Sequence, residues 1–256
     1  MKFKPTSKIE LKELVDNLEI NLGDIDTSLI TDMSQLFMFS TRTDFSGIEN
    51  WNISNVSDMS EMFYCCKNFN QPLNNWDVSS VTDMSEMFRN CINFNQDISK
   101  WNVSKVRGML DMFAGCRKFN QPLENWNVSN VISMTGMFEN ATNFNQPLNS
   151  WDTSSLVYTN QMFEGAKKFN QPLNNWNVSS VIEMRRMFVN AINFNQPLDN
   201  WNVSSVTDMS YMFFGAKKFN QPLNNWNVSR VIFMNGMFGG AESFNQPLDG
   251  WDISKF

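Results

Sequence analysis

Residues 201–225 read WNVSSVTDMSYMFFGAKKFNQPLNN, and this stretch decides the fold because nearly the same letters recur along the chain. The recurrence is marked by nine tryptophans spaced 25 residues apart, Trp51, Trp76, Trp101, Trp126, Trp151, Trp176, Trp201, Trp226 and Trp251. A fixed period of this kind is typical of structural units that stack and share one core. The pattern predicts one elongated repeat domain, with an irregular first rung over 25–50, eight 25-residue rungs over 51–250 and a final strand over 251–256.

The spacing of apolar residues changes inside the unit, and this change predicts its secondary structure. Trp101 and Val103 alternate with polar residues, as in a short strand with one buried face. From Val106 to Phe113 the apolar spacing becomes three, as in one or two helical turns. Gly or Asn at the slot of Gly115 is typical of the left-handed residue that ends a helix. We therefore expect an α/β repeat solenoid, a stack of short parallel strands and short helices.

Residues 1–24 do not repeat and are expected to cap the stack. A capping-box sequence begins at Ser7. Apolar residues follow it at helical intervals: Ile9, Leu14, Val15 and Leu18. The pattern predicts an amphipathic helix whose apolar face covers the first rung. No polar unit follows the predicted strand over 251–256, so pairing with another copy through this end is one partner hypothesis.

Several invariant positions are expected to serve the stack itself. The Asn and Gln of each Phe-Asn-Gln-Pro-Leu segment should form ladders, because a buried turn must satisfy its amides. The tryptophan column should be core, with a platform for sugars as the alternative. Cys66, Cys91 and Cys116 share their slot with Ala in later repeats, which indicates small buried groups.

Composition limits the chemistry and the partners. The chain has no histidine, so a zinc site would lack a fourth ligand and a Ser–His–Asp or Cys–His arrangement is excluded. No acidic pair departs from the repeat as the two carboxylates of a glycosidase would. A net charge of −6 argues against nucleic-acid binding, which depends on clustered Lys and Arg. We expect no enzyme, no cofactor and no metal.

The sequence carries no clear targeting signal. No apolar run approaches the roughly 20 residues of a membrane-spanning helix. The basic residues 1–7 are followed by a polar stretch where a signal peptide would carry its apolar core. The residues alone are therefore compatible with a cytoplasmic protein.

The rung W-N-V-S-x-V-T-D-M-S-x-M-F, complete at 201–213 and followed by F-x-Q-P-L at 219–223, resembles the BspA-like leucine-rich surface-protein repeats of mycoplasmas, Helicobacter, Fusobacterium and related bacteria. The resemblance spans residues 25–256. It implies a right-handed, leucine-rich-repeat-like solenoid in a surface or secreted protein that takes part in adhesion and host interaction. Trp, Val and Met here replace the Leu and Asn of ordinary leucine-rich repeats, and no leader sequence is visible.

Two surfaces vary enough to be binding candidates. The first is a basic stripe on alternate rungs, formed by Arg117, Lys118, Lys167, Lys168, Lys217 and Lys218. It suits an acidic partner, although alternation that keeps like charges off adjacent rungs would look the same. The second is a contact patch where Glu elsewhere gives way to basic, aliphatic or aromatic residues, formed by Arg185, Arg186, Val189, Tyr211 and Phe214. Arg and aromatic residues are enriched in protein interfaces.

These features predict a non-enzymatic repeat scaffold that binds another protein, such as a host protein. A carbohydrate-binding module that uses the polar Asn and Ser positions after each Trp is one alternative. A self-assembling structural protein is the other.

Overall fold

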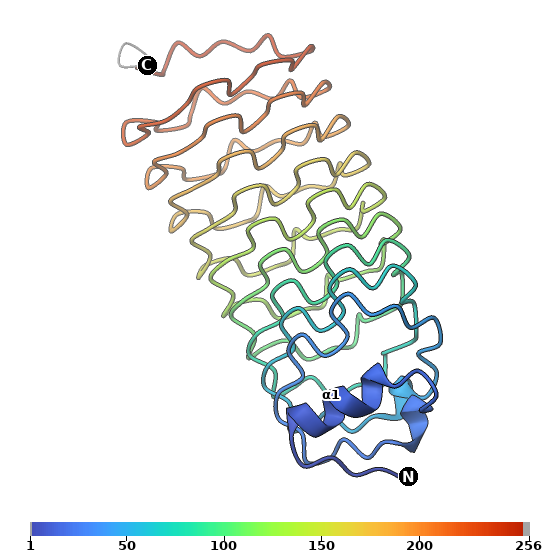
Figure 1. Cartoon of the computed structure of the whole chain (residues 1–256). Coiled ribbons are helices and arrows are strands. Elements are labelled where there is room, and N and C mark those ends of the chain that lie inside the picture. Colours follow the sequence, from blue (N-terminus) through green and yellow to red (C-terminus); the bar gives the residue numbers. More distant parts are fainter. Residues whose placement is uncertain (1, 253–256) are drawn as a thin grey trace.

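The computed structural model describes residues 2–252 and arranges the repeats as coils stacked along one axis (Figure 1). Each coil runs from one tryptophan to the residue before the next, and a first coil covers 25–50. The helices within residues 2–252 are α1 (Lys8–Asp16) and the short 3-10 helices η1 (Leu22–Asp24) and η2 (Ile48–Asn50). None of the helices in this range is long and apolar enough to cross a membrane.

The coils contain neither the strands nor the helices that the sequence predicts, so the expected α/β, leucine-rich-repeat-like solenoid is wrong. Between residues 2 and 252, adjacent coils are joined by isolated parallel bridges such as Asp83 to Gly108, and no bridge extends into a strand. The segment after Val106 is a series of tight turns. The Met112 N–H donates to the carbonyl of Met109, three residues back. In an α-helix it would donate to the carbonyl four residues back.

Left-handed residues prevent a helix in this segment. Asp111 has a φ of 51° and Gly115 a φ of 71°. The same two slots are left-handed in every coil from residue 51 onward, and an α-helix requires a negative φ at each residue. The prediction that the Gly115 slot is left-handed is confirmed, even at Cys65 with a φ of 61°. The three-residue apolar spacing comes from consecutive turns.

The N–H groups that the turns do not use bond the next coil. Met109, Asp111, Phe113 and Gly115 donate to the carbonyls of alternate residues in 133–139, over 2.6 to 3.3 Å. The pattern recurs at each junction from 33–39 to 209–215. Backbone groups of each coil are thus satisfied by turns within it and by bonds between coils, as burial requires.

Stacked aromatic rings fill the interior. Phe113 lies 4.2 Å from Phe119 in its own coil and 5.8 Å from Phe138 in the next, measured between ring centroids. The nine tryptophans are only 2–5% exposed, and Trp126 Nε1 donates to the carbonyl of Ile98 at 3.1 Å. The expectation that tryptophan belongs to the core is confirmed.

The Asn and Gln of each repeat and the cysteine slot also stabilise the stack. The Asn120 N–H donates to Asn95 Oδ1 at 2.9 Å, and Gln121 Nε2 donates to the Asn95 carbonyl at 3.0 Å, which confirms the ladders. Cys116 is buried, and its Sγ lies 2.9 Å from the carbonyl oxygen of Phe88. Cys66 and Cys91 make the same contact in their coils, so all three cysteines act as compact core groups with a weak S–H donor.

Helix α1 lies across the N-terminal end of the stack (Figure 1). Its N-cap is Ser7, as predicted, and Leu11 and Val15 are buried against the core. The predicted apolar face is wrong at Ile9, which is 73% exposed, and at Leu18, which follows the helix and is 56% exposed. Positions 11 and 15 share one side of a helix, whereas position 9 points away from that side.

At the other end, the last coil is less covered. Met234, Phe238, Phe244 and Leu248 are half-buried, whereas their equivalents in the preceding coil are buried. Most of the predicted final strand, residues 253–256, lies outside the described residues.

Candidate functional site

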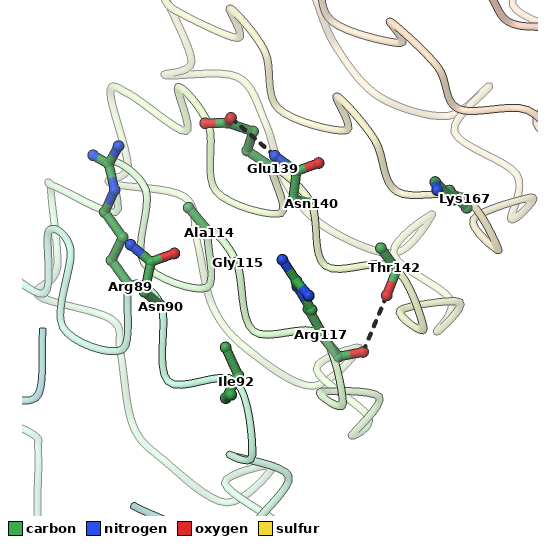
Figure 2. Close-up of a pocket in the computed structure, with 10 residues that line it drawn as sticks. All are labelled: Arg89, Asn90, Ile92, Ala114, Gly115, Arg117, Glu139, Asn140, Thr142 and Lys167. Atoms are coloured by element: carbon green, nitrogen blue, oxygen red, sulfur yellow. Dashed lines mark hydrogen bonds between the residues drawn. The ribbon is translucent and has the colours of Figure 1, made fainter. Parts of the chain in front are cut away.

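A hollow of about 530 Å³ opens on the side of the stack formed by the left-handed turns (Figure 2). It extends over four coils, from residue 89 to residue 167. We call it the basic groove. Its lining consists of Arg89, Asn90, Ile92, Ala114, Gly115, Arg117, Glu139, Asn140, Thr142 and Lys167.

Small residues in one coil create the hollow. Ala114 occupies a slot that holds Arg89 in the preceding coil and Glu139 in the following one. Gly115 lies beside Asn90, whose Oδ1 would be 2.3 Å from a Cβ at that position. The floor is therefore low between two walls of longer side chains, and a larger residue at 115 would displace Asn90.

Arg89 forms one wall and is held in place by its neighbours. Its Nη1 donates to Glu86 Oε2 at 3.0 Å and to Asp111 Oδ2 at 2.5 Å. Its guanidinium carbon also lies 5.9 Å from the ring centroid of Tyr64, within cation–π range. Two carboxylates offset its charge, so Arg89 shapes the groove more than it attracts an anion.

Two other cations line the groove, Arg117 and Lys167, and because no carboxylate within residues 2–252 offsets their charge we call them the groove cations. Both are exposed, and neither forms an ion pair within the part of the chain that the structure describes. Figure 2 shows Arg117 between Arg89 and Lys167, and the Thr142 hydroxyl donates to the Arg117 carbonyl at 3.4 Å. In a chain of net charge −6, these cations form a local reversal of sign that can receive an anionic group.

Glu139 adds a carboxylate at the rim. Burial, together with the nearby Glu164 and Asp111, raises the pKa of Glu139 above its usual value. Asn140 Nδ2 donates to Glu139 Oε1 at 3.1 Å, and Arg186 binds Glu164 through two nitrogens at 2.9 and 2.5 Å. Glu164 and Asp111 thus both lie near Glu139. However, no group of His, Cys, Asp or Glu within residues 2–252 could hold a metal ion.

The structure exposes all six residues of the predicted basic stripe and brings two of them, Arg117 and Lys167, to the groove. Lys217 instead pairs with Glu242 at 2.8 Å. The coils without a basic pair bond to the coils that have one, since Asn193 Nδ2 donates to the Lys167 carbonyl at 2.7 Å. Sequence reasoning missed Lys67, which stands in the same slot and could have been found by aligning the repeats.

The predicted contact patch is only partly a surface. Arg186 is engaged by Glu164, as described above, and Val189 is 3% exposed, so Val189 cannot touch a partner. Arg185 is exposed, while its backbone N–H donates to Asn160 Oδ1 at 2.9 Å. Of these three predicted residues, Arg185 has the most accessible side chain.

The aromatic pair of the patch lies on glycines. Tyr211 and Phe214 meet edge to face with centroids 5.9 Å apart, and Phe214 is 41% exposed. A Cβ at Gly236 would stand 2.5 Å from the Tyr211 ring, and one at Gly239 would stand 2.7 Å from the Phe214 ring. The next coil thus makes room for both rings, which explains how they are accommodated within the stack.

The polar positions after each tryptophan are occupied by local bonds. Asn127 Oδ1 accepts the Ser129 N–H at 3.1 Å and the Ser129 hydroxyl at 2.7 Å. The backbone bond recurs in other coils, as at Asn102 with Ser104. Each turn of this kind engages the amide oxygen in a local bond to the backbone.

Comparison with known proteins gives one family. Residues 9–124, 98–192 and 171–256 match the family described as "Mycoplasma protein of unknown function, DUF285". The three overlapping matches together run from residue 9 to residue 256. No curated protein and no solved structure gives a significant match.

Proposed function

The chain belongs to the Mycoplasma family of unknown function DUF285, and from this premise we propose that it is a non-enzymatic repeat scaffold whose basic groove binds an acidic segment of another protein. The observation that carries the proposal is the pair of groove cations, Arg117 and Lys167. They stand at a hollow of about 530 Å³ without a carboxylate partner among residues 2–252. An acidic side chain would supply that partner through charge-assisted hydrogen bonds.

The shape of the groove favours a segment over a small anion. The groove extends over several coils and combines cations with amide groups at Asn90 and Asn140 and the apolar Ile92. A peptide presents carboxylates, backbone groups and apolar side chains together, and can use all three kinds of contact. The groove is also local, whereas nucleic-acid binding would need basic residues spread over a larger face.

The non-enzymatic part of the proposal is supported by the residues themselves. The chain has no histidine to act as a base. The groove carboxylate Glu139 is bonded to its neighbour Asn140, and no second groove-lining carboxylate faces it across the hollow. General acid–base chemistry would need such a pair or an equivalent partner.

The resemblance to BspA-like surface repeats supports a more specific form of this proposal. In that form, the acidic segment belongs to a surface protein of a host cell and the interaction serves adhesion. A repeat surface suits this role because the stack holds its side chains on a rigid frame.

Binding can be tested with a fluorescein-labelled oligoglutamate peptide, followed by anisotropy at several salt concentrations. Removing both groove cations in Arg117→Gln/Lys167→Gln should weaken binding at least about tenfold and reduce its salt dependence. The matched control is Lys118→Gln/Lys218→Gln, which removes the same charge from exposed positions outside the groove lining. An oligoglutamine peptide measures binding that does not depend on charge.

Equal loss in both double variants would contradict a groove site and indicate general attraction to the stripe. No measurable oligoglutamate binding to the unaltered chain would refute the acidic-segment proposal. A sulfated oligosaccharide that binds where the peptide does not would change the partner class to a glycan.

A further inference from the structure

A second hollow, of about 460 Å³, lies between α1 and the first coil. We call it the end groove. Ile9 of α1 lies on one side, and Met38 and Phe39 of the first coil lie on the other. Ile9 is 73% exposed and Phe39 is 62% exposed, which is unusual for large apolar residues in a chain whose other phenylalanines mostly lie inside the stack.

Both lysines that line the end groove are paired, and Glu13, the lining charge without an ion pair among residues 2–252, is exposed to solvent. Lys8 binds the carboxylate of Asp32 at 3.2 Å, and Lys12 pairs with Asp16 one helical turn away. Phe39 is fixed by an edge-to-face contact with Tyr64, with centroids 5.2 Å apart. The hollow therefore offers no free cation to an acidic segment, and its exposed Ile9 and Phe39 favour an uncharged, apolar occupant.

The backbone of the first coil adds a requirement for hydrogen-bond donors. In the next coil, Ser60 and Tyr64 accept N–H groups from Gln35 and Phe39, both at 2.9 Å. Ser34 and Met38 are the equivalents of Ser60 and Tyr64 in the first coil, and they line the end groove. Among residues 2–252 no coil precedes the first coil, and α1 lies at that end of the stack (Figure 1).

Within residues 2–252, no donor bonds the carbonyl oxygens of Ser34 and Met38. Unpaired backbone groups beside an apolar surface are a template for another chain. A helix offers no free N–H groups along its middle, and a lipid chain offers none at all. The occupant that satisfies both the apolar rim and the carbonyls is a non-helical peptide segment.

We propose that the end groove binds a short, uncharged, non-helical peptide segment of a partner, which continues the stack at its N-terminal end. The segment donates backbone N–H groups to Ser34 and Met38 and packs an apolar side chain between Ile9 and Phe39. Main-chain bonds then provide affinity and the apolar rim provides specificity, as when a peptide adds to a sheet edge. This site is separate from the basic groove, so either can exist without the other.

The test is a selection of short random peptides displayed on phage, carried out against the whole chain. Phe39→Asn is the first variant, because Phe39 is left-handed with a φ of 57° and Asn fills the equivalent slot at Asn90 and Asn140. Ile9→Ser is the second. Leu29→Ser is the matched control, since Leu29 is 50% exposed and does not line the end groove.

Selected peptides should be apolar and should lose at least about tenfold in affinity with Phe39→Asn and with Ile9→Ser, but less than about twofold with Leu29→Ser. Methylating single backbone nitrogens of a selected peptide should abolish binding at the donating positions and be tolerated at others. Three outcomes would overturn the proposal: no peptide is enriched, binding is unchanged in both variants, or every N-methylated peptide still binds.

Discussion

Gly136 lies at a position where the turn structure and the helix predicted from sequence give opposite expectations. In a helix interior, Gly136→Ala would stabilise the chain by about 0.5–1 kcal/mol. In the structure, Gly136 has a φ of 61°, and a Cβ there would stand 1.7 Å from Asp111 Oδ1. The substitution must therefore strain the backbone and displace the Asp111 carboxylate.

Two costs add in the free energy of unfolding. The left-handed conformation costs a residue with a side chain about 1–2 kcal/mol. A displaced Asp111 also loses its bond to Arg89 Nη1, and a hydrogen bond between charged groups is worth roughly 1.5–3 kcal/mol. Gly136→Ala should therefore destabilise the chain by about 2.5–5 kcal/mol. Gly240→Ala is the control, because its φ is 69° but the nearest atoms to a Cβ lie 3.6 Å away, so only the first cost applies.

Urea denaturation, followed by tryptophan fluorescence and by circular dichroism, measures both variants. Agreement between the two probes checks that unfolding is two-state, since long repeat arrays can depart from it. In an Asp111→Gly background the clash and the Arg89 bond are both absent, so adding Gly136→Ala there should cost only the left-handed strain, about 1–2 kcal/mol. A Gly136→Ala variant as stable as the unaltered chain would refute the turn structure, and a cost equal to that of Gly240→Ala would refute the role of Asp111.

Two further predictions concern titrating groups. Burial and two neighbouring carboxylates raise the pKa of Glu139, so its contribution to stability falls as pH rises through the interval between the ordinary value of 4.5 and the raised one. Glu139→Gln should therefore increase stability at neutral pH and flatten the dependence over that interval; parallel pH profiles of stability would contradict this. Burial raises the pKa of the Cys66 thiol to about 12 and that of Cys116 further, so iodoacetamide at about pH 8 should label only the half-buried Cys65 in the folded chain and all cysteines in urea. Rapid labelling of Cys116 in the folded chain, read by mass spectrometry, would contradict its burial.

The sequence predicts the stack and its core because those depend on invariant slots. Trp, Phe and the Phe-Asn-Gln-Pro-Leu segment recur at one period, and identical residues in register must lie above one another. Secondary structure could not be predicted in the same way. An apolar spacing of three suits a helix and also suits consecutive turns, and only the sign of φ at the slot of Asp111 decides between them. That slot also holds Glu61, Arg186 and Tyr211, which give no sign of a left-handed backbone.

The candidate site was predictable in part. The basic stripe follows from the alternation of basic pairs, and its side chains are exposed. The groove depends on Ala114, the one small residue in its slot between Tyr64 and Phe214, so the signal was present but required adjacent repeats to be compared slot by slot. Burial of Val189 could not be read from the repeat, because that slot holds polar, aromatic and aliphatic residues in different coils.

The variable slots are only partly free to specify a partner, because adjacent coils constrain each other. Arg186 binds Glu164, which lies 22 residues earlier, and Asp111 binds Arg89 at the same separation. The residue in one slot must therefore suit its neighbour in the preceding coil. An unusual residue in such a slot can be there to pair with that neighbour. A cation that lacks such a partner has no comparable role within the stack. The two groove cations meet that condition and also stand at the hollow, whereas Arg186 is bound by Glu164, which is why the basic groove carries the proposed function.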